Sequence, residues 1–327
     1  MAIVLATLSA FLFGSSDFVG GYATRKNGAL VVVLLSQAAG LIAAVLATVA
    51  FGDPFAGPRD LLFGALAGVG AVVGLVLLYH GLATTVVGVV SPVAAVVGAL
   101  FPVVFGLAAG ERPALTAWIG MVVAIPAIAL LVWERPTRKA RPPEAQPPEN
   151  APHPEPSSRD VQEGSAEEPA ARTAPAGSAG EAAARAGRPA LPRSVTAAAI
   201  GIAAGIGFGL SVIAISRVSA ETTLWPIAAA RVAGIAGLVP ILILRRRPVR
   251  VARGSWIYIV LAGILDMTGT IAFLQASRGT LLAIAAVITS LYPAPTVILG
   301  AVVLKEHITA TRGVGLVLAV AGIALIS

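Results

Sequence analysis

The chain has no cysteine and only three histidines, and 12% of its 327 residues are charged. Without cysteine, disulfide bonds and thiolate metal sites are excluded. The histidines, His80, His153 and His307, are scattered along the chain, so no metal site is expected. Soluble domains carry about 25% charged residues. The low charge content therefore argues against an ordinary soluble protein.

Motifs of soluble enzymes are also absent. The chain has no GxxxxGK[ST] loop, so it is not expected to hydrolyse ATP in the manner of P-loop proteins. It contains no HExxH motif, no GxSxG elbow and no paired cysteine–histidine cluster. The sequence therefore predicts that the protein is not an enzyme and that it holds neither a cofactor nor a metal.

Hydrophobic residues make up 57% of the chain and gather in unbroken runs. Runs of about 20 apolar residues match a hydrocarbon layer ~30 Å thick. Unbroken runs indicate helices, because strands of a membrane barrel alternate between apolar and polar residues. The sequence predicts an all-α integral membrane protein with ten transmembrane helices, over residues 2–23, 29–51, 61–83, 86–109, 115–133, 196–216, 222–244, 255–277, 280–303 and 309–326.

The chain contains one hydrophobic block twice, in residues 1–133 and 195–327. The two copies align without a gap at a constant shift of 195, which places Phe13 on Phe208 and Glu111 on Glu306. Each block holds five spans, and five is odd, so the second copy must enter the bilayer upside down. Inverted repeats of this kind build many secondary transporters and place a site near the membrane midplane.

Residues 134–194 have a different composition, rich in Pro, Ala, Glu, Arg and Ser. Such a segment cannot bury enough apolar surface to offset its chain entropy, so it is predicted to be disordered. We interpret it as a tether between the blocks, with a regulatory docking tail as the alternative. The first span lacks a cationic n-region and has a counterpart in the second block, so it is expected to be a retained helix rather than a signal peptide.

Cationic residues set the expected orientation. The net charge of +7 comes from loops beside the spans and does not indicate nucleic-acid binding. Loops that follow odd-numbered spans carry Arg25-Lys26, Arg245-Arg246-Arg247, and Lys305 with Arg312. Loops that follow even-numbered spans carry only Arg59, Arg112, Arg217 and Arg278. Cationic loops prefer the cytoplasm, which predicts a multi-pass cell-membrane protein with the linker inside and both chain ends outside.

Two opposite charges, Arg231 and Asp266, lie midway along consecutive predicted spans. A charge at the bilayer centre costs roughly 2.5–3.5 kcal/mol by insertion scales, so the two are expected to form a pair. The pair either neutralises itself inside the bundle or belongs to a site linked to substrate or protons. Asp266 has no acidic counterpart, because Ala71 occupies that place in the first block.

Further polar residues inside the spans are candidates for the site. Asp17 lies toward one end of the first span, where it could also reach water beside Arg25 or Lys26. Gln37 lies near the middle of the second span, where an interhelical hydrogen bond is the alternative to a substrate contact.

Residues near the ends of the spans are further candidates for the site, and each also has a structural explanation. His80 and Gln275 occupy matched positions of the two blocks, either as interfacial anchors or as part of a gate. Trp225 and Tyr292 could line a cavity for an organic ligand or lie at the interface or in the bundle.

Prolines predict kinks or gates in one span of each block. Pro92 and Pro102 are expected to interrupt the fourth span, and Pro293 and Pro295 the ninth. Proline removes a backbone donor and loosens a helix, and broken helices at matching places in two repeats point to a transport site. Proline is also commoner in membrane helices generally, which is the alternative explanation.

These features together resemble the EamA-type family of the drug/metabolite transporter superfamily. The residues that carry the resemblance are Phe13-Gly14-Ser15-Ser16, Phe208-Gly209, Ala229-Ala230-Arg231, Pro293, Lys305-Glu306 and Gly315. The first block departs from the pattern, with Gly98 in the place of Pro293 and Ser36 in the place of Arg231. The resemblance implies ten helices in two five-helix repeats, and export of small organic metabolites or drugs driven by ion or metabolite gradients. Family members are commonly drawn with both termini in the cytoplasm, whereas the charges here predict the opposite.

The resulting hypothesis is a secondary active transporter that works by alternating access. Its cavity is expected between the first, third, fourth, sixth, eighth and ninth spans, with Arg231 reaching toward it. The expected partners are the lipid bilayer, a small-molecule substrate and, for coupling, protons, in a monomer or a homodimer. The alternatives are uptake of a sugar or another nutrient, and a non-transporting membrane scaffold or sensor.

Overall fold

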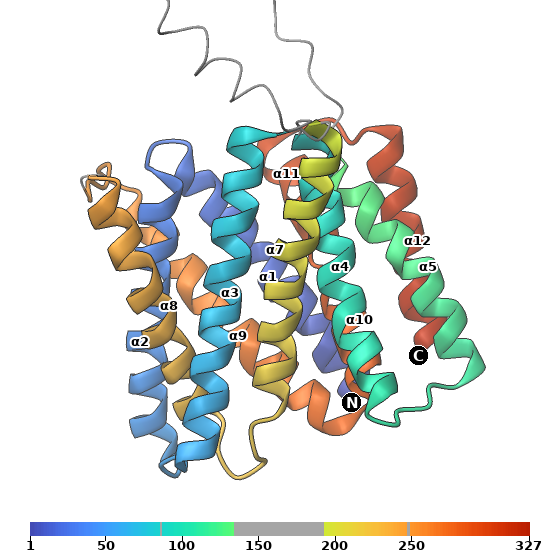
Figure 1. The fold of residues 1–327 in the computed structure, drawn as a ribbon, viewed down its shortest axis with the longest axis horizontal. Helices are drawn as coiled ribbons and strands as arrows, with labels where there is room; N and C mark the ends of the chain where they lie inside the picture. The colour runs from blue at the N-terminus through green and yellow to red at the C-terminus, as the bar shows by residue number, and fades with distance from the viewer. Residues whose placement is uncertain (86, 134–192, 247–248) are drawn as a thin grey trace, which may run out of the picture. The chain divides into compact units, whose positions relative to one another are not determined.

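The computed structural model describes residues 1–85, 87–133, 193–246 and 249–327 (Figure 1). The predicted linker lies outside these residues except for Arg193 and Ser194, which begin a helix. Every predicted span contains helix, and the boundaries lie within about three residues of the prediction. The elements are α1 (Ala2–Thr24), α2 (Ala29–Phe51), α3 (Pro58–Thr84), α4 (Val87–Ala108), α5 (Leu115–Val132), α7 (Arg193–Ser216), α8 (Leu224–Leu244), α9 (Trp256–Gly279), α10 (Leu282–Thr289), α11 (Pro293–Leu304) and α12 (Ala310–Ile326).

Length and composition identify membrane spans among these helices. Within the described ranges, nine helical stretches are long and apolar enough to cross a bilayer, and Ala310–Ile326 is a shorter apolar helix. Large apolar side chains such as Phe51, Leu244 and Val302 are at least 70% exposed on the helical surface. Such exposure suits contact with lipid rather than water. The protein is therefore a multi-pass, all-helical membrane protein.

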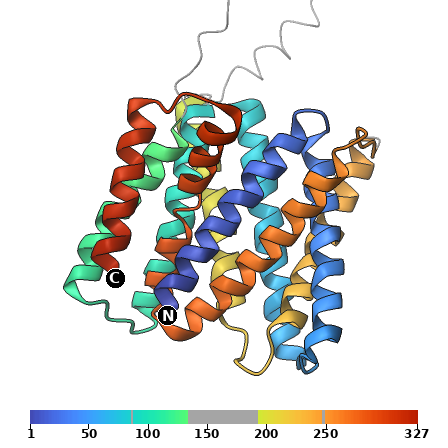
Figure 2. The ribbon, with the colours of Figure 1, turned by 180° about the vertical axis from the view of Figure 1, so that it is seen from behind.

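Helices of the two blocks interlock rather than forming separate bundles. The most extensive contacts join α1 to α9, α3 and α4 to α7, α5 to α12, and α2 and α3 to α8. Figures 1 and 2 show α5 beside α12 at one end of the row of helices and α2 beside α8 at the other.

The connections between helices alternate between two ends of the bundle. The α4–α5 connection lies at the end that carries both chain termini, and the α11–α12 connection lies at the opposite end (Figures 1 and 2). The first connection contains Glu111 and the second contains Glu306. Residues matched by the repeat thus lie at opposite ends, which is compatible with inverted repeats.

Glycines allow the close approach of helices from different blocks. A Cβ atom added at Gly64 or Gly68 of α3 would overlap the backbone of α8 at Pro226 or Ala230. Lipid tails are as apolar as leucine, so membrane helices associate through such close packing. At both positions the glycine allows α3 to pack closely on α8.

The substitution Gly68→Ala is therefore expected to destabilise the protein by about 1–3 kcal/mol, because overpacking forces α3 and α8 apart. Thermal unfolding of the purified protein in detergent measures this loss. Gly313→Ala in α12 is the matched control, because a Cβ atom there meets nothing within 4 Å. Equal melting temperatures for the two variants would contradict the packing role of Gly68.

The ninth predicted span is divided, as its prolines suggested. Residues Ser290–Tyr292 separate α10 from α11, and Pro293 begins α11, where its missing N–H leaves no helical bond unmade. The fourth span differs from its prediction, because α4 continues through Pro92 and Pro102 without a break. One proline removes one backbone donor, and neighbouring helices in a membrane protein can compensate for that loss.

Candidate functional site

A cavity of about 420 Å³ lies inside the bundle. It is lined by α1, α3, α4, α7, α9 and the α10–α11 break, which are the six spans that the sequence analysis expected to enclose a site. Its polar lining includes Asp17, Tyr79, Asp266 and Tyr292. We call it the central cavity.

Arg231 and Asp266 form the expected ion pair at the edge of this cavity. Nη1 of Arg231 donates to Oδ2 of Asp266 and, over 2.5 Å, to Oε1 of Gln37. Nη2 of Arg231 donates to the Thr270 hydroxyl over 3.2 Å, and that hydroxyl donates to the carbonyl oxygen of Asp266 over 2.9 Å. Three helices, α2, α8 and α9, therefore meet at one polar centre.

The two charges of the pair are not equally accessible. The Arg231 side chain is 9% exposed, whereas that of Asp266 is 36% exposed. Asp266 lines the central cavity and also a smaller cavity of about 200 Å³, which Arg231 and Gln37 share. The carboxylate is therefore the part of the pair that a ligand in the central cavity can reach, with the guanidinium behind it.

Local packing explains how an arginine fits inside this bundle. A Cβ atom at Gly40 of α2 would lie 3.5 Å from Nε of Arg231 and 3.1 Å from the Gly263 carbonyl oxygen. A Cβ atom at Gly234 of α8 would lie 3.3 Å from Nε2 of Gln37. These two glycines leave room for the guanidinium and for the amide that binds it.

Asp17 lines internal cavities and does not form the pair with Arg25 that is expected of an acid at a helix end. Its side chain is exposed to the cavities that it lines, and no described residue donates a hydrogen bond to it. The alternative pairing with Arg25 is not observed, because Arg25 binds Glu306 over 3.1 Å. Asp17 is thus a carboxylate without a protein partner among these residues, on the wall of an internal cavity.

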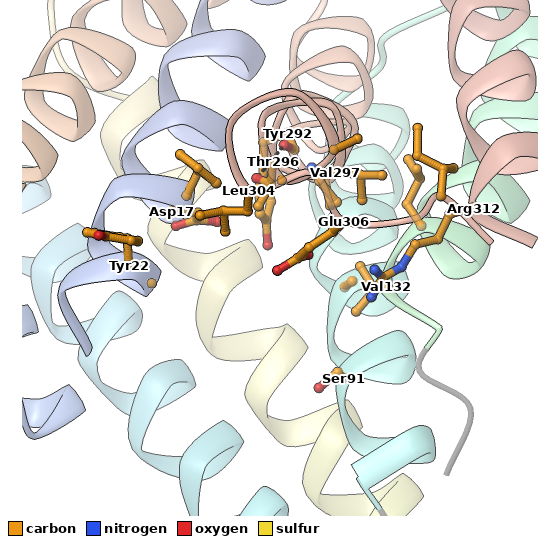
Figure 3. A pocket seen from close by; sticks show the side chains of 18 of the residues that line it. Asp17, Tyr22, Ser91, Val132, Tyr292, Thr296, Val297, Leu304, Glu306 and Arg312 are labelled. Atoms are coloured by element: carbon orange, nitrogen blue, oxygen red, sulfur yellow. Dashed lines mark hydrogen bonds between the residues drawn. The ribbon is translucent and has the colours of Figure 1, made fainter. Parts of the chain in front are cut away.

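A second cavity of about 490 Å³, which we call the outer cavity, adjoins the central one and shares Asp17, Phe208 and Tyr292 with it. Figure 3 shows Asp17 and Tyr22 on one side of the outer cavity in this view, Arg312 on the other, and Glu306 between them. The outer cavity reaches the α11–α12 connection. The polar centre is therefore connected, through adjoining cavities, toward one end of the bundle.

Hydrogen bonds hold the connections at the opposite end. The Glu111 carboxylate accepts from the backbone N–H groups of Leu282 (2.7 Å) and Ala283 (3.0 Å), the first two residues of α10. A carboxylate at a helix N-terminus also complements the helix dipole.

A second cluster of hydrogen bonds surrounds the α7–α8 connection at the same end. Arg278 donates to the carbonyl oxygens of Ser219 and Thr222 and to the Thr223 hydroxyl. Asp53 accepts from the backbone of Thr223 and Leu224. These hydrogen bonds link the α2–α3 connection and the end of α9 to the α7–α8 connection.

Three predicted site residues lie outside the cavities described above. His80 is exposed near the end of α3. Gln275 is exposed and lies 3.5 Å from the Thr223 hydroxyl. The Trp225 indole donates to the Asp53 carbonyl oxygen over 3.3 Å, and its ring packs against Phe55. These three residues therefore belong to helix ends and their connections.

The aromatic lining of the central cavity comes mainly from residues that the sequence analysis did not select. Tyr292 was predicted, whereas Tyr79, Phe13, Phe208 and Phe273 were not selected as site residues. Two of these residues could have been found from the repeat, because Phe13 and Phe208 occupy matched positions of the two blocks. No group of His, Asp and Glu side chains in the described part of the chain is arranged to hold a metal ion.

Comparisons with known proteins give a family match for the second block and a fold for the chain. No curated protein matches the sequence. Residues 195–327 match the model of the EamA-like transporter family, which confirms the predicted resemblance over the second block. A solved structure titled "Crystal structure of protein" superposes with a TM-score of 0.67 at 16% identity, covering 99% of this chain and 95% of that chain. At that identity the likeness shows a shared fold.

Proposed function

With residues 195–327 matching the EamA-like transporter family, whose members are membrane transporters, we propose that this chain is a secondary active transporter of a small organic metabolite or drug. The observation that carries the proposal is the pair of adjoining cavities, which lead from the Arg231–Asp266 pair toward one end of the bundle. A membrane scaffold or sensor would be expected to have a dry, fully packed interior instead.

The arrangement of the two ends supports alternating access. The outer cavity reaches the α11–α12 end, while Glu111, Arg278 and Asp53 hold helices together at the other end. Alternating access requires that one set of contacts forms while the other opens, so that a central site faces one side at a time. The break between α10 and α11 provides a point at which part of the wall can move relative to the rest.

The family resemblance implies export as the direction, and the predicted orientation is compatible with it. The cationic loops predict that the α11–α12 end faces the cytoplasm. A substrate would then enter the cavity from inside the cell and leave after the opposite end opens. Asp17 and Asp266 offer two cavity-lining carboxylates at which a proton could exchange with substrate, so a proton or metabolite gradient can drive the cycle.

Transport into proteoliposomes tests this function. We expect at least one compound from a panel of radiolabelled amino acids, sugars and cationic drugs to accumulate above the level of protein-free liposomes. An imposed proton gradient is expected to increase the rate if protons couple the cycle. If only sugars or other nutrients move, and only down an inward gradient, the result would favour the uptake alternative. If no compound of the panel moves, even in counterflow exchange, the result would favour the scaffold.

A further inference from the structure

The central cavity has an unbalanced charge. Its lining contains two carboxylates, Asp17 and Asp266, and no Lys, Arg or His. Arg231 lies behind Asp266 and bonds to it, so that this pair is neutral as a unit. Asp17 receives no hydrogen bond from the described residues. The Asp17 carboxyl group, when it is ionised, therefore faces the cavity without a protein counter-charge on its wall.

An uncompensated carboxylate inside a membrane protein is costly, and such groups typically mark a substrate or ion pathway. A cationic ligand would supply the missing counter-charge. An anionic ligand would instead meet Asp17 and Asp266 with no cation on the lining to offset the repulsion. The remaining polar groups of the wall are the hydroxyls of Ser211, Thr289, Ser290 and the two tyrosines, with no amide side chain. The other lining residues are Leu, Ala, Val, Gly and Phe, which suit an apolar body better than a sugar.

Aromatic rings surround the same space. Phe13, Phe208 and Phe273 line it together with the tyrosines Tyr79 and Tyr292. Aromatic faces attract organic ammonium groups through cation–π interactions and also bury an apolar body. A volume of about 420 Å³ is within the ordinary range for a small organic ligand.

We propose that the central cavity binds an organic monocation with an aromatic or apolar body, whose charged nitrogen lies at the Asp17 carboxylate. Tyr79 and Tyr292 contribute aromatic surface near that carboxylate, and the phenylalanines hold the apolar body. Arg231 keeps Asp266 neutralised, so with Asp17 ionised the cavity carries one net negative charge and matches one positive charge. This inference rests on the proposed function, because it names the substrate class of the same site.

Binding to the purified, full-length protein in detergent tests this inference without a gradient or a bilayer. The probes are benzyltrimethylammonium, a permanent cation, and benzylsulfonate, an anion of similar size. Isothermal titration calorimetry is expected to detect the cation and not the anion. Asp17→Asn is expected to weaken cation binding at least about tenfold, as removal of one partner of a desolvated charge pair does. Asp17→Glu is expected to retain binding.

Glu306→Gln is the matched control, because Glu306 is an exposed carboxylate paired with Arg25 at the rim of the outer cavity. We expect its affinity for the cation to stay within about twofold of the original, since exposed ion pairs contribute little. Equal binding of cation and anion by the unchanged protein would overturn the inference, whatever the variants do. Cation binding that is unaffected by Asp17→Asn would overturn the role of Asp17.

The two proposals fail in distinguishable ways. Cation binding in detergent together with no movement of any compound in proteoliposomes would remove the transporter and leave the cation site. Transport of an anion or a neutral compound, with no binding of benzyltrimethylammonium, would leave the transporter and remove the cation site.

Discussion

Asp266→Asn is expected to reduce gradient-driven transport to the level of protein-free liposomes, while the protein still inserts into the membrane. Asp266 is the accessible half of the buried pair and lines two adjoining cavities. Asparagine keeps the shape of the side chain but can neither carry the negative charge nor exchange a proton. Removal of the carboxylate also leaves the buried Arg231 guanidinium without its counter-charge, so the melting temperature is expected to fall. The initial transport rate in proteoliposomes measures the first effect.

A double variant separates the two roles of the pair. Arg231→Gln combined with Asp266→Asn removes both charges, and a neutral pair of similar volume is expected to regain much of the lost stability. If Asp266 serves transport, the double variant stays inactive although it is stable. Recovered transport in the double variant would assign the pair a structural role, and full transport by Asp266→Asn alone would remove the carboxylate from the mechanism.

Glu111→Ala is expected to open the end of the bundle that hydrogen bonds close in this structure. The Glu111 carboxylate binds two backbone N–H groups at the start of α10, and alanine leaves both without that acceptor. The loss of a helix cap costs about 0.5–2 kcal/mol, enough to shift a balanced equilibrium between the closed and open ends about two- to thirtyfold.

Thiol labelling measures this opening. Because the chain has no cysteine, a single Ser211→Cys on the cavity wall gives one defined thiol. Its labelling by a membrane-impermeant maleimide, applied from the side of the α4–α5 connection, is expected to rise several-fold.

Glu306→Ala provides the control for this experiment. Glu306 is the repeat counterpart of Glu111 but is exposed at the opposite end and bonded to Arg25. Its removal is expected to leave labelling from the α4–α5 side unchanged. Equal labelling of the Glu111→Ala and Glu306→Ala proteins would show that the Glu111 bonds do not hold that end closed.

The positions of the helices could be predicted from sequence because hydrophobic length alone determines a membrane span. The prediction that prolines interrupt a helix held for the ninth span and failed for the fourth. The ninth span divides where Pro293 can begin a new helix, whereas α4 accommodates Pro92 and Pro102 within one helix. Composition cannot separate these cases, because the difference depends on how neighbouring helices satisfy the freed carbonyl groups.

The candidate site could be predicted only in part. Equal depth in consecutive spans was enough to pair Arg231 with Asp266, and the structure forms that pair. The rotation of each helix about its axis was not available from sequence, so the bond from Arg231 to Thr270 was missed. The same limit explains why the sequence left Trp225 open between a cavity wall and a place at the interface or in the bundle; in the structure it packs beside the α2–α3 connection.

The interlocked helices have a consequence for how the protein is made. The main partner of α1 is α9, and that of α5 is α12, so the earliest helices contact their partners only after nearly the whole chain has been synthesised. Contacts so distant in sequence form slowly, because long loops must close first. Ribosomes that stall before α7 would leave the glycine-rich face of α3 bare in the membrane, where quality-control proteases can recognise it.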